Sequence, residues 1–246
     1  MNAYPIKCIL PHDRYMQIDN SNLIECSCLH TDTDCIITDN IISDSHSNKE
    51  LHHSNNVTTG VGLIKLYGDH SSDDYKVVTH DSLGDQFSFI YTSRLVFFHE
   101  KDLRNVVYNS IGHDEVTLTY AVETSSSSYR DEIMSGVVHS RLSIRYIGVV
   151  VSSGFDMGYG VFTEGAIGDQ TFLGEYVGVV SSMNETTEHS NHFNALYPDC
   201  DGGYSINARE YGNIIRFINH SNDPNAEFKA VKIDELMHVI CVSSIS

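Results

Sequence analysis

The apolar residues of this chain occur in short runs that are rich in β-branched and aromatic residues. Each run is bounded by Gly, Asp, Asn or Ser, which is the pattern of strands joined by turns. The clearest runs are Val61–Tyr67, Phe87–Thr92, Leu95–Phe98, Val116–Val122, Leu142–Val151 and Thr171–Val180. The spacing of an amphipathic helix is hardly found, and the one candidate is a short helix around Ala208–Phe217. We therefore expect a mainly β fold.

Changes in composition divide the chain into four segments. The first is polar and turn-rich, and we expect loops there with two short strands, at Ile6–Leu10 and Cys35–Thr38. A serine run near residue 125 has the composition of a linker. The predicted segments are a polar, loop-rich N-terminal segment (1–56), a β-rich region (57–122), a linker (123–140) and a C-terminal domain (141–246).

The charge balance excludes some partners and favours others. The chain has 246 residues with a formal net charge of -18, and 41% of them are hydrophobic, which is enough for a core. A nucleic acid would be repelled by this charge, whereas a basic peptide would be attracted. No run approaches the ~18 apolar residues of a membrane span, and the start of the chain lacks the pattern of a signal peptide. We expect an intracellular protein, in the nucleus or the cytoplasm, without direct contact to nucleic acid or membrane.

The cysteines and histidines raise the question of a metal. Six cysteines are too few for a disulfide scaffold, which indicates a reducing compartment. Cys26, Cys28, His30 and Cys35 are four soft ligands close together in the sequence. Their spacing departs from that of a zinc knuckle, so we expect unliganded thiols and no metal site, with zinc as the alternative.

Three motifs in the last hundred residues could carry chemistry. Gly158-Tyr159-Gly160 places two glycines around an aromatic residue, where the backbone can approach a ligand closely; the alternative is an ordinary turn. Gly174–Gly178 carries Tyr176 between glycines, and its alternative role is that of a core tyrosine. Gly212–Asn225 is an apolar segment that ends in Asn-His-Ser and Pro-Asn, and the proline forces a turn.

Together and in this order, the three motifs resemble the SET domain, the family of S-adenosylmethionine-dependent protein lysine methyltransferases. The resemblance covers about residues 141–246, and the run Arg216–Asn225 is its most specific part. It implies a fold of small β-sheets with a pseudoknot, in which residues 212–225 pass through a loop made by the C-terminal segment. It also implies S-adenosylmethionine as the cofactor and a lysine-containing protein or peptide as the partner, with histones among the candidates.

The resemblance implies roles for individual residues on the cofactor side. Gly158-Tyr159-Gly160 corresponds to the loop whose backbone meets the methionyl and ribose part of the cofactor. Asn219 and His220 correspond to the pair that holds its amino group and its adenine, and Arg216 is expected near that pocket.

Other residues are implied on the lysine side. Tyr176 corresponds to a catalytic tyrosine of the lysine channel, and Tyr204 is a second candidate. Phe228 is expected near the position where some members carry a tyrosine that limits the number of methyl groups added; the alternative is simple core packing. The nucleophilic amine must be neutral, and an apolar channel beside a sulfonium lowers the pKa of a lysine. We therefore expect no general-base carboxylate and give Glu175 no such role.

The sequence departs from the family pattern in three places. The chain stops at Ser246, before the expected Gly-Glu-Glu-Leu stretch and closing tyrosine, so we expect little turnover by these residues alone. Asn222 stands where many members carry a cysteine, and the zinc site that follows the domain in those members is not expected. Asn207 stands where aspartate is common.

The leading hypothesis is a protein-lysine N-methyltransferase. A catalytically inactive SET-like module that binds a peptide or the cofactor is the alternative from another class. A β-rich metal-binding or interaction protein with chance motifs is the third. The substrate protein, the degree of methylation and the role of residues 1–122 are not predicted.

Overall fold

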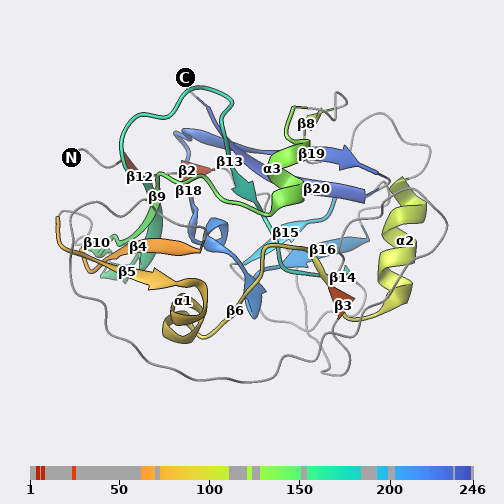
Figure 1. Cartoon of the computed structure of the whole chain (residues 1–246), viewed down its shortest axis with the longest axis horizontal. Coiled ribbons are helices and arrows are strands. Elements are labelled where there is room, and N and C mark those ends of the chain that lie inside the picture. The colour runs from red at the N-terminus through yellow and green to blue at the C-terminus, as the bar shows by residue number, and fades with distance from the viewer. Residues whose placement is uncertain are drawn as a thin grey trace.

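A computed structural model of the chain has several small sheets and few helices, which confirms the prediction of a mainly β protein (Figure 1). The predicted pseudoknot stays a prediction. The structure describes residues 4–5, 7–8, 24–25, 62–69, 73–110, 121–123, 128–150, 154–183, 193–198, 203–234 and 236–244.

The first sheet contains the glycine motif. Its order is β1 (Tyr4–Pro5), β12 (Tyr159–Thr163), β9 (Leu142–Tyr146), β4 (Leu63–Tyr67) and β5 (Tyr75–Thr79). Neighbouring strands are antiparallel except β4 and β9, which are parallel. Strand β5 is an edge strand in which Val78 is the one buried residue, so most of its side chains face solvent.

The second sheet is built on a long hairpin. Its order is β13 (Phe172–Glu175), β20 (Leu236–Ser243), β19 (Ala226–Ile233) and β8 (Ala121–Glu123). Asp234 in the hairpin turn has a φ of 50°, the left-handed conformation that tight hairpin turns require. Arg130 holds the Asp234 carboxylate through two hydrogen bonds of 3.0 and 2.6 Å.

The remaining strands form one five-stranded sheet and three pairs. The order in the sheet is β15 (Asn194–Leu196), β16 (Tyr204–Asn207), β14 (Val179–Ser182), β7 (Val96–Phe97) and β3 (Ile24–Glu25). The pairs are β10 (Val149–Val150) with β11 (Phe155–Asp156), β17 (Tyr211–Gly212) with β6 (Ile90–Tyr91), and β18 (Asn219–His220) with β2 (Lys7–Cys8).

Three α-helices within the described ranges correct the expectation that convincing helices are hardly present. They are α1 (His80–Phe87), α2 (Glu100–Ser110) and α3 (Arg130–Ser135). Helix α1 is capped by Thr79, whose Oγ1 accepts a hydrogen bond from the Ser82 amide at 3.2 Å. Leu83 and Gly84 are its only buried residues, so its apolar face is too narrow to stand out in the sequence. The predicted run Phe87–Thr92 accordingly contains the end of α1, and only Ile90–Tyr91 are strand.

The predicted helix at Ala208–Phe217 is wrong. Tyr211–Gly212 form strand β17, and a 3₁₀ helix, η2, covers Ile214–Phe217. The Asn213 side chain caps η2, because its Oδ1 accepts a hydrogen bond from the Ile215 amide at 3.0 Å. The cap starts a new turn here instead of continuing a helix from residue 208.

Other predicted strands are found with shorter bounds. Leu142–Val151 divides into β9 and β10, and Thr171–Val180 divides into β13 and the start of β14. Cys35–Thr38 lies outside the described residues. The predicted linker contains α3, whose Ile133 is fully buried in a small cluster with Phe172 and Val231; the division into four segments stays a prediction.

One large apolar cluster joins the sheets and includes Leu83, Val161, Leu173, Ile206 and Val239. In Figure 1 the β19–β20 hairpin lies on one side of this core, and β4, β5 and α1 lie on another. Helix α2 packs against β14 and β20 and adds the buried Val106 to the core. Among the described residues, no helix is long and apolar enough to cross a membrane.

Candidate functional site

The glycine motif forms the tight turn and the strand start that its sequence suggests. Gly158 has a φ of +63°, and its amide donates a hydrogen bond of 2.8 Å to Asp156 Oδ1. Nothing lies within 4 Å of a Cβ atom built at Gly158, so glycine is needed there for the backbone conformation and not for space. The motif thus leaves an open side at its first glycine.

Gly160 has the opposite reason for being glycine. A Cβ atom built there would lie 2.7 Å from Ile147 Cδ1 and 2.9 Å from Asn219 Nδ2. The same Nδ2 donates a hydrogen bond of 3.2 Å to the carbonyl oxygen of Tyr159. The structure therefore brings the glycine motif and the Asn-His motif into contact, although they are distant in the sequence.

Asn219 and His220 are also next to the N-terminal segment. They form β18, which pairs in parallel with Lys7–Cys8, and β1 pairs with the strand that carries Gly160. The His220 side chain is exposed and Asn219 is half-buried. The two N-terminal strands thus flank both pieces of the candidate site.

Arg216 lies beneath this region on η2. Its guanidinium carbon lies 4.3 Å from the ring centre of Phe89, 4.1 Å from that of Phe193 and 5.3 Å from that of Phe217. Its Nη2 donates a hydrogen bond of 2.9 Å to Arg209 O, and its buried Nε has no hydrogen-bond partner among the described residues. Burial lowers the pKa of Arg216 to about 10, and the nearby Tyr176 acts in the opposite direction. The side chain is therefore still a cation at neutral pH.

Tyr176 is buried next to Arg216 and Phe228. Its hydroxyl donates a hydrogen bond of 2.5 Å to the Phe193 carbonyl oxygen, and its ring meets that of Phe228 edge-on with centres 5.5 Å apart. Burial raises the pKa of Tyr176, so the hydroxyl keeps its proton at neutral pH. Tyr176 is therefore a neutral hydroxyl in an aromatic wall.

Tyr204 lies differently. Its hydroxyl accepts a hydrogen bond of 2.9 Å from Asn105 Nδ2 and lies 3.4 Å from Asp102 Oδ1, both on α2. The ring is buried in the same core cluster as Tyr176. Its role as a second channel tyrosine stays a prediction.

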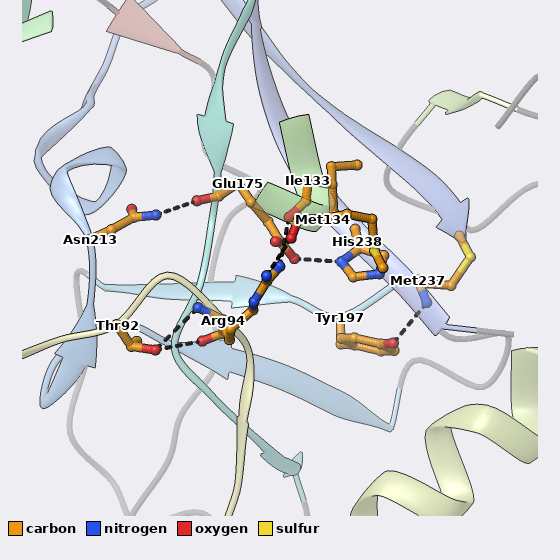
Figure 2. A network of polar contacts seen from close by, with 9 residues as sticks. All are labelled: Thr92, Arg94, Ile133, Met134, Glu175, Tyr197, Asn213, Met237 and His238. Atoms are coloured by element: carbon orange, nitrogen blue, oxygen red, sulfur yellow. Dashed lines mark hydrogen bonds and ion pairs between the residues drawn. The ribbon is translucent and has the colours of Figure 1, made fainter. Parts of the chain in front are cut away.

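Glu175, the residue before Tyr176, is fixed from two sides (Figure 2). Its Oε1 lies 2.7 Å from His238 Nδ1 on β20, and its carbonyl oxygen accepts a hydrogen bond of 2.8 Å from Asn213 Nδ2. Figure 2 also shows Arg94 reaching the carbonyl oxygens of Ile133 and Met134. The Glu175 side chain is thus held by His238, and the expectation that it has no general-base role stays a prediction.

Three residues of this region were not found from the sequence. Asn213 precedes an apolar run, which is a capping signal that could have been used. Phe193 lies in a polar stretch without a pattern, and His238 lies in a buried strand, so neither gives a signal. All three act through contacts between distant segments.

The residues present fit S-adenosylmethionine in their chemistry. The glycine motif supplies an open backbone at Gly158 and a close approach at Gly160. Asn219 supplies an amide, and the half-buried Tyr159 and Phe217 supply aromatic surface. A few polar groups within aromatic walls are typical of cofactor sites.

A metal has no comparable support. Within the described ranges, no group of three His, Cys, Asp or Glu side chains is placed to hold an ion. Cys26, Cys28, His30 and Cys35 lie outside those ranges, so the zinc alternative stays open.

Comparison with known proteins shows a family match for the C-terminal part of the chain. Residues 158–246 match the family model of the SET domain. The resemblance deduced from the sequence is therefore confirmed for this part of the chain, and the cofactor of SET-domain methyltransferases is S-adenosylmethionine.

Several histone-lysine methyltransferases are similar to this chain. Mes-4 from Caenorhabditis elegans is 33% identical over 109 residues, which are 40% of this chain and 12% of mes-4. EHMT1 from Homo sapiens is 42% identical over 72 residues, which are 28% of this chain and 6% of EHMT1. The chain thus spans a small part of these relatives. A crystal structure of ATXR5 in complex with histone H3.1 matches 74% of this chain and 87% of that chain, with 17% identity and a TM-score of 0.48.

Proposed function

We propose that the chain carries a protein-lysine methyltransferase site that uses S-adenosylmethionine. The observation that supports this most directly is the contact of Asn219 with the Gly158–Gly160 motif. A family match alone would give the class, but this contact joins the two cofactor motifs in one place. Arg216 lies on η2, just before Asn219 in the sequence, and Tyr176, the residue proposed for the lysine side, is close to Arg216.

On the cofactor side, the residues of this chain bind the cofactor and orient it. Gly158 and Gly160 let the backbone approach the methionyl and ribose part of the cofactor. The Nδ2 atom of Asn219 is bonded to the Tyr159 carbonyl oxygen, and the Oδ1 atom of Asn219 is not used in that contact. The backbone of His220 completes the adenine side. When bound, S-adenosylmethionine supplies an electrophilic methyl group on a sulfonium.

On the lysine side, Tyr176 and Phe228 form an apolar wall. The target amine would lose its proton to water and form the new N–C bond with its lone pair, and bound S-adenosylmethionine would supply the methyl group, its sulfur keeping the electrons of the broken C–S bond. An apolar wall favours the neutral amine, because burial disfavours the ammonium form. The Tyr176 hydroxyl and neighbouring carbonyls orient the amine, so no carboxylate base is needed.

The substrate is proposed to be a basic protein segment, with histone tails as the first candidates. A net charge of -18 attracts lysine-rich segments. The similar proteins mes-4 and EHMT1 are named as histone-lysine methyltransferases. A histone substrate also makes the nucleus the proposed location.

A transfer assay tests this function. The protein is made from its complete natural coding sequence and mixed with S-adenosylmethionine that carries an isotope-labelled methyl group and with a histone-tail peptide. Mass spectrometry is expected to find the label on a lysine of the peptide. The matched control peptide has every lysine replaced by arginine and should stay unlabelled. Saturable cofactor binding without any transfer would instead favour the non-catalytic binding module.

A further inference from the structure

A segment far from the family match is attached to the candidate site by its backbone. Strand β6 pairs in parallel with β17, the Ile90 amide donates to Glu210 O at 2.7 Å, and the Thr92 amide donates to Gly212 O at 2.9 Å. Gly212 lies just before η2, which carries Arg216 and Phe217. Residues 80–92 are therefore fixed at the base of the site.

The turn after α1 shapes this segment. Ser88 has a φ of 56°, and the Phe89 amide donates a hydrogen bond of 3.0 Å to Gly84 O. A Cβ atom built at Gly84 would lie 2.4 Å from the Phe89 carbonyl oxygen. Only glycine lets the chain fold back so tightly, and the turn brings Phe87 and Phe89 to the same ring, that of Phe217.

Three aromatic rings from distant segments meet as a result. The Phe87 ring is edge-on to Tyr159, with centres 4.8 Å apart and an angle of 81°, and edge-on to Phe217, with centres 4.9 Å apart and an angle of 61°. All three rings are half-buried. Phe89 lies deeper, buried against Arg216.

Polar groups of the site border these rings. The Tyr159 carbonyl accepts the hydrogen bond from Asn219, and Tyr159 stands between the two glycines of the motif. A half-exposed aromatic surface beside backbone and amide groups has the chemistry that a flat, partly polar heterocycle needs.

We propose that Phe87, together with Tyr159 and Phe217, forms the surface on which the adenine ring of S-adenosylmethionine packs. The proposal rests on the proposed function and extends it, because it makes residues 80–92 part of the cofactor site. Phe87 would then contact the ligand, and Phe89 and the turn at Ser88 would be positioning residues.

A tryptophan probe tests the contact directly. The chain contains no tryptophan, so Phe87→Trp introduces a single fluorophore at the proposed surface. Titration with S-adenosylhomocysteine, the demethylated product, is expected to change its emission in a saturable way. The matched control is Tyr108→Trp on the exposed face of α2, where Tyr108 is 76% exposed, and its emission should not respond.

Calorimetry with the same ligand separates the outcomes. We expect Phe87→Ala to raise the dissociation constant about tenfold. Phe87→Tyr, and Asp85→Ala on the same helix, should leave the dissociation constant unchanged. Thermal unfolding without ligand shows whether the alanine variant is folded; if it is not, the fluorescence result decides. No binding by the wild type would overturn the proposed function and this proposal with it. Wild-type binding, with no change of emission in Phe87→Trp and full affinity in Phe87→Ala, would overturn this proposal alone.

Discussion

At the scale of single residues, Tyr176 is the side chain on which the lysine side of the site depends. Its hydroxyl donates to Phe193 O, and that carbonyl also accepts the Ala208 amide at 2.9 Å. Tyr176→Phe therefore leaves the carbonyl satisfied and should lower the free energy of unfolding by about 1 kcal/mol. Methyl transfer should fall about 100-fold, because the hydroxyl oxygen that accepts a hydrogen bond from the amine and orients it is lost, while cofactor affinity stays the same.

Tyr197→Phe is the matched control for that variant. Tyr197 is equally buried, and its hydroxyl accepts a hydrogen bond of 3.1 Å from the Met237 amide. We expect a loss of stability at least as large, measured by denaturant unfolding, because the buried Met237 amide loses this acceptor, and no loss of transfer. Equal transfer by the Tyr176 and Tyr197 variants would remove Tyr176 from the mechanism.

Phe228 is expected to set the number of methyl groups added. Its ring is buried and edge-on to Tyr176, and it offers no hydrogen bond to a partly methylated amine. Phe228→Tyr adds a hydroxyl that can hold the amine through a water. Mass spectrometry of a methylated peptide should show a shift from higher products to monomethyl-lysine. An unchanged product distribution would mean that Phe228 only packs in the core.

Some residues of the candidate site could be predicted from the sequence, and others could not. Gly160 and Asn219 were chosen from local motifs, and the structure places them in contact. Phe193 and His238 could not have been chosen, because their importance comes from partners elsewhere in the chain. A local motif indicates the backbone conformation that it needs, whereas a contact between two distant segments cannot be deduced from the sequence of either segment.

At the scale of elements, α1 and β6 act as one unit. The His80 ring stacks on the Tyr91 ring with centres 3.6 Å apart, and Tyr91 is in the strand that pairs with β17. Burial lowers the pKa of His80, and the nearby Asp81 partly opposes this. The unit therefore holds His80 in its neutral form.

This shift predicts a pH dependence of stability. Because the folded pKa of His80 is depressed, the unfolded chain binds more protons as the pH falls below about 6.5. The contribution of His80 is complete above that pH and is lost as the pH falls through the folded pKa. His80→Phe keeps the stack and should reduce the loss of unfolding free energy between about pH 8 and pH 5.

His139 adds a second contribution to the pH dependence of stability, with the same sign, because burial and Arg141 lower its pKa too. The His80→Phe variant should therefore still lose some stability in acid. A pH profile identical to that of the wild type would show that His80 does not titrate with folding.

Some strands could be predicted, whereas others, including the long strands β19 and β20, were not, and the partners of the strands could not be predicted. Short apolar runs indicate strands directly, as at Leu63–Tyr67 and Leu142–Tyr146. Nothing in either run says that they pair in parallel, with Lys65 opposite Ser143. The helices were missed for a different reason, since α1 buries only Leu83 and Gly84 and gives almost no apolar stripe.

At the scale of the whole molecule, charge governs the encounter with a substrate. The net charge of -18 should speed association with a lysine-rich peptide. Affinity measured by fluorescence anisotropy should weaken markedly as salt rises, because the screening length is only about 10 Å at 0.1 M. An acidic peptide of equal length is the control. A salt-independent affinity, or a preference for the acidic peptide, would contradict this expectation.

The proposed function as a whole depends on one cofactor site made from two distant motifs. Calorimetry with S-adenosylmethionine tests it most directly, on the wild type, on Gly160→Val and on Gly168→Ala. A valine at 160 would push against Ile147 and Asn219, whereas a Cβ atom at Gly168 lies 3.4 Å from its nearest neighbour, Thr171 Oγ1. We predict saturable one-to-one binding by the wild type and by Gly168→Ala, and none by Gly160→Val. Undiminished binding by a folded Gly160→Val variant, or no binding by the folded wild type, would contradict a cofactor site at this place.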